Sequence, residues 1–190
     1  MIYIVIGTLG FLVIKYFDIV SLKRIPWAKP FTWILGSGLL AYSLIMICLA
    51  PDKLPLPIWS TWLGWTLFSV SLFLLIYSLF INLPFRKTYI TSGVGDRLVT
   101  TGLYALVRHP WVHGFTLLLL SLVLVSSSSL LLVAAPVWIL LYILLVFIQD
   151  KFFFGMMFDG YDHYQQETPM LVPNQRSINA FINSLKRSKA

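Results

Sequence analysis

The chain has 190 residues, of which 58% are hydrophobic and only 11% are charged, and its mean hydropathy is +0.84. A soluble globular domain does not have this composition. Apolar runs near the length needed to cross a bilayer recur along the chain, so the sequence predicts an integral membrane protein. The formal net charge of +7 does not indicate nucleic-acid binding, because there is no soluble basic domain to carry that function.

Five apolar runs are candidates for membrane helices. They cover residues 1–17, 31–50, 58–83, 111–125 and 130–148. The first run lacks the basic lead-in and the cleavage site of a signal peptide, so we expect it to be a helix of the mature protein. The fourth is short for a full span. Only a turn of four serines separates it from the fifth, which predicts an antiparallel helical hairpin.

Lysine and arginine gather on one side of this five-helix arrangement. Of the 14 basic residues, 12 fall in three segments that five spans place on the same side, namely 18–30, 84–110 and the part after 148. The loops of the opposite side contain only Lys53. The positive-inside rule therefore predicts an N-terminus outside and a C-terminus in the cytoplasm.

The chain becomes polar after the last apolar run. From Ser177 onward, one helical face collects four apolar side chains, which are Ile178, Phe181, Ile182 and Leu185. Lys186 and Arg187 lie beside this face. The pattern predicts a basic amphipathic helix on the inner leaflet, and a partner-binding helix is the alternative.

The most informative stretch is residues 98–114, LVTTGLYALVRHPWVHG, which leads into the fourth apolar run. Arg108 and His109 stand immediately before Pro110. Proline lacks a backbone N–H and suits the first turn of a helix, so we expect a helix to begin there. The two polar side chains would then lie at the membrane boundary, either for chemistry or only to anchor the helix end at the lipid headgroups.

A second polar cluster lies at residues 149–167. The predicted hairpin brings both clusters to the cytoplasmic side, where they could wall a polar cavity that opens onto lipid. Metal binding is a weaker interpretation, and its ligands would be His109, His113, His163 and Asp150. Because Pro110 interrupts the helix between the first two histidines, and no zinc-protease motif occurs, we expect no metal site.

Residues 98–114 resemble the motif that isoprenylcysteine carboxyl methyltransferases share with bacterial phospholipid methyltransferases. That motif reads Leu-Val-Thr-Thr/Ser-Gly-x-Tyr-x-x-x-Arg-His-Pro-x-Tyr-x-Gly, and only its second tyrosine is missing, replaced by Val112. The tail of the family also matches in its spaced tyrosines and prolines, at Tyr161, Tyr164, Pro169 and Pro173. The resemblance covers about residues 96–173.

The resemblance implies an all-α integral membrane protein with about five transmembrane helices, a C-terminal helical hairpin and a cytoplasmic cofactor pocket. The pocket would hold S-adenosylmethionine, and a lipophilic acceptor with a carboxylate, amine or thiol would enter from the bilayer. The implied parts are N-terminal helices over 1–95, a methyltransferase-like core over 96–173 and the C-terminal helix over 174–190. We expect a prokaryotic plasma membrane protein without a nucleic-acid partner.

The residues that the resemblance places around the cofactor come from both polar clusters. They are Asp96, Arg97, Leu98, Val99, Tyr104, Arg108, His109, Pro110, Trp111, Val112, Gln149 and Asp150. An imidazole and main-chain N–H groups can hold the cofactor carboxylate, and aromatic faces suit its sulfonium cation. No catalytic residue is assigned.

The tail departs from the family's pattern where two glutamates are expected and Gln149 and Asp150 stand instead. With one carboxylate left, we expect Asp150 to be the main counter-charge to the cofactor. Two alternatives stay open. One is a membrane reductase of the sterol-reductase type with a nicotinamide cofactor, against which the Arg-His-Pro sequence speaks. The other is a non-catalytic membrane protein that keeps the fold, which the missing acidic residue favours.

Overall fold

The structure is a computed structural model that describes residues 1–190 except 26, 85, 92–96 and 188–190. The described part of the chain consists of helices and connecting loops, without a strand. In chain order the α-helices and π-helical turns (η) are α1 (Ile2–Leu22), α2 (Ala28–Cys48), α3 (Ile58–Ile76), η1 (Tyr77–Ile81), η2 (Arg86–Ile90), α4 (Leu103–Leu106), α5 (Pro110–Ser126), α6 (Ser129–Ile148), η3 (Gln149–Phe153), α7 (Phe154–Met157), α8 (Tyr161–Glu167) and α9 (Gln175–Arg187).

The predicted all-α membrane fold is confirmed. By length and composition, four helical segments among the described residues can cross a membrane, and they are Ile2–Leu22, Ala28–Cys48, Ile58–Ile81 and Ser129–Met157. The fifth predicted span is α5, an apolar helix of 17 residues. It is about 26 Å long at 1.5 Å per residue, slightly less than the hydrocarbon thickness. Its crossing of the membrane stays a prediction.

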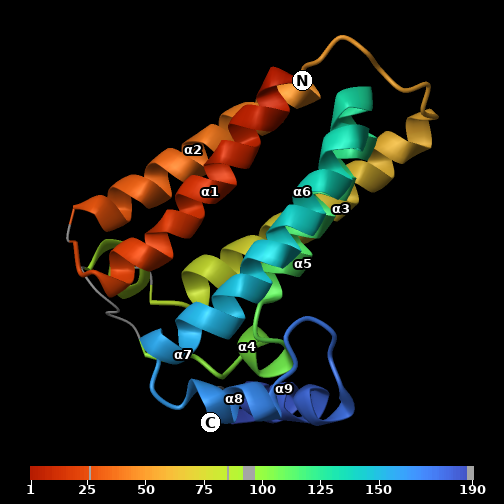
Figure 1. Ribbon diagram of the computed structural model, residues 1–190. Coiled ribbons are helices and arrows are strands. Elements are labelled where there is room, and N and C mark those ends of the chain that lie inside the picture. The colour runs from red at the N-terminus through yellow and green to blue at the C-terminus, as the bar shows by residue number, and fades with distance from the viewer. Residues whose placement is uncertain (26, 85, 92–96, 188–190) are drawn as a thin grey trace.

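Two loops lie together at one end of the bundle, as five spans require (Figure 1). The backbone N–H of Leu54, between α2 and α3, donates to the carbonyl of Ser127 in the α5–α6 turn, at 2.6 Å. The hydroxyl of Ser128 donates to the carbonyl of Ile47 at 2.7 Å and also caps the start of α6. The predicted hairpin of α5 and α6 is confirmed, and α5 runs from one end of the bundle to the other.

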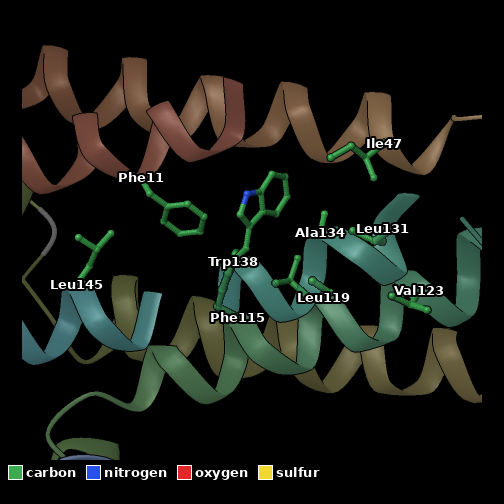
Figure 2. Close-up of a cluster of buried hydrophobic side chains, with 10 residues drawn as sticks. Phe11, Ile47, Phe115, Leu119, Val123, Leu131, Ala134, Trp138 and Leu145 are labelled. Atoms are coloured by element: carbon green, nitrogen blue, oxygen red, sulfur yellow. The ribbon is translucent and has the colours of Figure 1, made fainter. Parts of the chain in front are cut away.

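The long helices form two groups, α1 with α2 and α3 with α5 and α6, and the side chain of Trp138 packs between them. In the first, α1 and α2 approach closely at Gly10 and Gly36, where an added Cβ would lie 2.9 Å from the facing carbonyl oxygen. In the second, α5 packs between α3 and α6. Trp138 of α6 is 0% exposed and lies between the groups, against Phe11 of α1 (Figure 2). Its indole N–H donates to the Thr8 hydroxyl at 3.2 Å.

The first helix is longer than its apolar run. We expected it to end at residue 17, but α1 continues to Leu22. Asp18 does not end the helix because its carboxylate is paired with Lys15 one turn earlier, at 3.4 Å, and accepts a hydrogen bond from Gln149 at 2.9 Å. The hydroxyl of Ser21 likewise bonds within the helix, to the carbonyl of Phe17.

The polar C-terminal elements gather at the other end of the bundle, where α4, α7, α8 and α9 lie (Figure 1). The predicted C-terminal amphipathic helix is present as α9. Asn174 accepts from the N–H of Ser177 at 2.9 Å and so caps it. The apolar residues Ile178, Ile182 and Leu185 are all more than one-third exposed. Contact of this face with the inner leaflet stays a prediction.

The orientation of the bundle can be tested with single cysteines in a Cys48→Ala background. In sealed right-side-out vesicles, cysteines at Lys87 and Asn183 should be protected from an impermeant thiol reagent, and one at Asp52 should be labelled. The reason is that the basic loops lie at the end that holds Lys87 and α9. All three should react after permeabilisation. Labelling of Lys87 in intact vesicles would contradict a cytoplasmic C-terminus.

Candidate active site

The Arg-His-Pro segment is an extended strap between α4 and α5. Val107 and His109 have φ angles of −147° and −127°, and α5 begins at Pro110 as the sequence predicts. The backbone N–H of Arg108 donates to the carbonyl of Pro169 at 3.0 Å, and that of His109 donates to the carbonyl of Met170 at 3.3 Å. These bonds join the first motif to the tail.

The side chains of this strap meet at the carboxylate of Asp150 in η3. Arg108 donates two hydrogen bonds to it, from Nε at 2.9 Å and from Nη2 at 2.7 Å. Nε2 of His109 lies 2.8 Å from Oδ1. The Tyr161 hydroxyl donates to the same oxygen, and the Gln165 amide donates to Oδ2 at 2.9 Å. We call these five residues the Asp150 cluster. Its carboxylate accepts hydrogen bonds from four side chains.

Burial makes the charges of the cluster interdependent. Arg108, His109 and Asp150 are only 9%, 0% and 6% exposed. Burial acts to lower the pKa of Arg108, but the hydrogen bonds and the charge of Asp150 outweigh it, so this pKa is raised. Burial lowers the pKa of His109, and Asp150 only partly offsets that effect. Arg108 and Asp150 therefore form the ion pair of the cluster, and burial favours the neutral form of the His109 imidazole.

The neutral imidazole leaves one buried acceptor. If Nε2–H donates to Asp150, Nδ1 carries a lone pair, and no described residue offers this atom a hydrogen bond. The ring lies edge-on to Trp111, with centroids 5.0 Å apart, and is stacked on Phe154 at 5.6 Å. Both aromatic side chains line a cavity beside the Asp150 cluster, so the imidazole lies one layer behind the cavity wall.

Tyr164 of the tail and Tyr104 of α4 form a chain of hydrogen bonds. The Tyr164 hydroxyl donates to the carbonyl of Tyr104 at 2.6 Å, and the Tyr104 hydroxyl donates to the carbonyl of Ser78 at 3.1 Å. Burial raises the pKa of Tyr164, and burial together with Asp150 raises that of Tyr161. Both hydroxyls therefore stay protonated and can act as donors. This chain of contacts links α8, α4 and η1.

An apolar cavity of about 310 Å³ opens beside the cluster, between the strap, the ends of α3 and α6, and the helices α1 and α2. Seven of the predicted cofactor residues line it, namely Arg97, Leu98, Val99, Tyr104, Arg108, Trp111 and Gln149. Four others, His109, Pro110, Val112 and Asp150, are buried and are not among the lining residues. Asp96 lies outside the described residues.

Comparison with known proteins now bears on this arrangement. A family model described as phospholipid methyltransferase matches residues 59–158, which is more than half of the chain. The chain belongs to this family. Searches among curated proteins and among solved structures give no significant match. Membership of the phospholipid methyltransferase family indicates a membrane methyltransferase, and the matched region contains the strap, the cavity-lining end of α6 and Asp150.

The phospholipid methyltransferase match leaves one wall of the cavity unaccounted for, because α1 and α2 precede residue 59. This wall contributes Lys15, Asp18 and Lys29 in the middle of aromatic and aliphatic side chains. Lys29 is 2% exposed and donates to the carbonyl of Thr91 at 3.2 Å. Sequence reasoning missed all three residues. The available signal was the i, i+3 spacing of Lys15 and Asp18 at the end of a membrane helix, where charges are costly.

The histidines of the chain do not gather at one place. His163 lies on the exposed side of α8, with Nε2 3.7 Å from Glu167, and His113 is exposed on α5. His109 is buried against Asp150. Within the described ranges, no group of three or more His, Cys, Asp or Glu residues is arranged to hold a metal ion.

Proposed function

We propose that the protein transfers a methyl group from S-adenosylmethionine to a lipophilic acceptor that reaches the cavity from the bilayer. The observation that carries this proposal is a single cavity with two kinds of wall. Seven residues of the predicted cofactor set form one side, and largely apolar side chains of α1, α2 and α3 form the other. A polar donor and a greasy acceptor can therefore meet in one space.

The residues of the cavity fit the chemistry of the cofactor. Tyr104, Trp111 and Phe154 present aromatic faces, which attract a sulfonium cation. Behind this wall, Nδ1 of His109 is a buried acceptor without a partner among the described residues. A ligand N–H or O–H would satisfy it if Trp111 or Phe154 moved aside, because the ring does not itself line the cavity. Arg97 is an exposed cation at the rim that can pair with the ligand carboxylate. When bound, S-adenosylmethionine supplies an electrophilic methyl group.

The chain's part in the reaction is alignment and exclusion of water. The Asp150 cluster fixes the strap, so the residues that face the cofactor are held in one geometry. The apolar wall keeps water from the reacting atoms and accepts the hydrocarbon part of the acceptor. We also propose that residues 96–173 form the cofactor-binding core, that 1–95 form the acceptor side, and that 174–190 lie on the cytoplasmic leaflet.

The first test is ligand binding by the purified protein in a neutral detergent. Calorimetric titration with S-adenosylmethionine and S-adenosylhomocysteine should give saturable binding to one site, and the reduced nicotinamide cofactor should not bind. The aromatic side chains that line the cavity support the adenosyl ligands. Binding of only the nicotinamide would favour a reductase, and binding of neither would favour a non-catalytic protein that keeps the fold.

A further inference from the structure

The counter-charge expected of Asp150 is already matched inside the protein. Its two oxygens accept two hydrogen bonds from the Arg108 guanidinium, and three further donors complete the set. The residue does not line the cavity. A sulfonium in the cavity would thus find this carboxylate behind the wall and neutralised by a bidentate cation.

A different carboxylate faces the cavity, from α1. Asp18 is 3% exposed, and of the acidic residues that the structure describes it is the one that lines this space. One of its oxygens accepts from the side-chain amide of Gln149 at 2.9 Å, and the other is 3.4 Å from Nζ of Lys15. All three side chains line the cavity. Burying a carboxylate inside a membrane bundle is costly, so such residues tend to serve binding or catalysis.

The contact with Gln149 explains why this carboxylate lies where it does. The tip of the Gln149 side chain and the tip of Asp18 are in hydrogen-bond contact, so a carboxylate on either residue would occupy the same part of the cavity. Position 149 is the first of the two positions at which the resemblance leads us to expect an acidic residue. In this chain that position carries an amide, and α1 brings the negative charge to it.

We propose that Asp18 is the binding residue that balances the positive charge of S-adenosylmethionine in this chain, with Gln149 holding it in place. This rests on the proposed function. The charge that the family pattern places at position 149 in η3 is thus supplied from α1, which lies outside the region matched by the family. Before the cofactor binds, Lys15 balances the charge of the Asp18 carboxylate and lowers the cost of burying it. When the cofactor is bound, Lys15 and the sulfonium both interact with this carboxylate, so Lys15 weakens cofactor binding.

The test compares two ligands that differ in the sulfonium charge. Asp18→Asn removes the negative charge but keeps an oxygen that can accept from Gln149. It should weaken S-adenosylmethionine about tenfold and S-adenosylhomocysteine less than about threefold, measured by calorimetry in detergent. Lys15→Gln should act in the opposite direction and tighten S-adenosylmethionine. Asp159→Asn, an exposed carboxylate on the same side of the bundle, is the matched control and should change neither affinity.

Relocating the charge gives the decisive variant. Asp18→Asn/Gln149→Glu places the carboxylate at position 149 in η3 and preserves the hydrogen bond with its direction reversed, so affinity for S-adenosylmethionine should return to within about threefold of the parent. Equal losses for both ligands in Asp18→Asn, or no loss, would overturn the assignment. So would tighter binding by Lys15→Gln of S-adenosylhomocysteine alone. Failure of the parent to bind either ligand would instead overturn the proposed function.

Discussion

Replacing Arg108 with Met should lower the free energy of unfolding by about 3–5 kcal/mol, because it leaves the Asp150 carboxylate buried without a cation. Both side chains are less than one-tenth exposed, so water screens the pair little. Nη1 of Arg108 also donates to the carbonyls of Gln165 and Thr168, which would lose their donor. Denaturant titration in detergent, followed by circular dichroism, measures the loss.

Two further variants show whether the unpaired charge of Asp150 causes the loss of stability in Arg108→Met. Arg97→Met removes an exposed cation that lines the same cavity and should change the unfolding free energy by less than about 0.5 kcal/mol. Asp150→Asn in the Arg108→Met background removes the stranded charge but keeps an acceptor for His109 and Tyr161, so it should recover at least about 1 kcal/mol. A double variant no more stable than Arg108→Met would show that the lost packing matters and the ion pair does not.

The parts of the fold that follow local rules were predictable. Pro110 begins α5 because proline fits the first turn of a helix. The helices α5 and α6 form a hairpin because the serine turn between them is short. The end of α1 was not predictable. A charged residue normally marks the exit of a membrane helix, but Asp18 stays inside because Lys15 pairs with it and because Gln149, 131 positions away, donates a hydrogen bond to it.

Contacts between residues far apart in the sequence also decide which parts of the candidate site were predictable. Tyr104, Arg108 and Trp111 of the motif and Gln149 of the second cluster line one cavity, because a helical hairpin must bring its two ends together. That this cavity holds the cofactor stays a prediction. The sequence could not show that Arg108 and Asp150 would pair with each other. From the sequence alone, the Asp150 carboxylate looks available to a cofactor, because its partner Arg108 is not known. In the structure that carboxylate is already paired, and among the described residues Asp18 on α1 is the carboxylate that lines the cavity.

The last expectation concerns the imidazole behind the cavity wall. His109→Phe keeps the ring against Phe154 and Trp111 but removes both nitrogens. If Nδ1 accepts a hydrogen bond from the bound cofactor, affinity for S-adenosylhomocysteine should fall tenfold to a hundredfold, or about 1.5–3 kcal/mol. The atom is buried and has no acceptor or donor partner in the described structure, so no internal hydrogen bond would replace the lost one.

His109→Phe also removes the contact of Nε2 with the Asp150 carboxylate. A control must therefore distinguish a lost contact with the cofactor from damage to the Asp150 cluster. Gln165→Leu removes a different donor from the same carboxylate and does not line the cavity. It should cost a similar free energy of unfolding, about 1–2 kcal/mol, with less than a threefold change in affinity. His163→Ala, on the exposed side of α8, should change neither quantity. Equal losses of affinity in His109→Phe and Gln165→Leu would show that His109 only supports Asp150, and the cofactor would then have to be held by residues of the cavity wall alone.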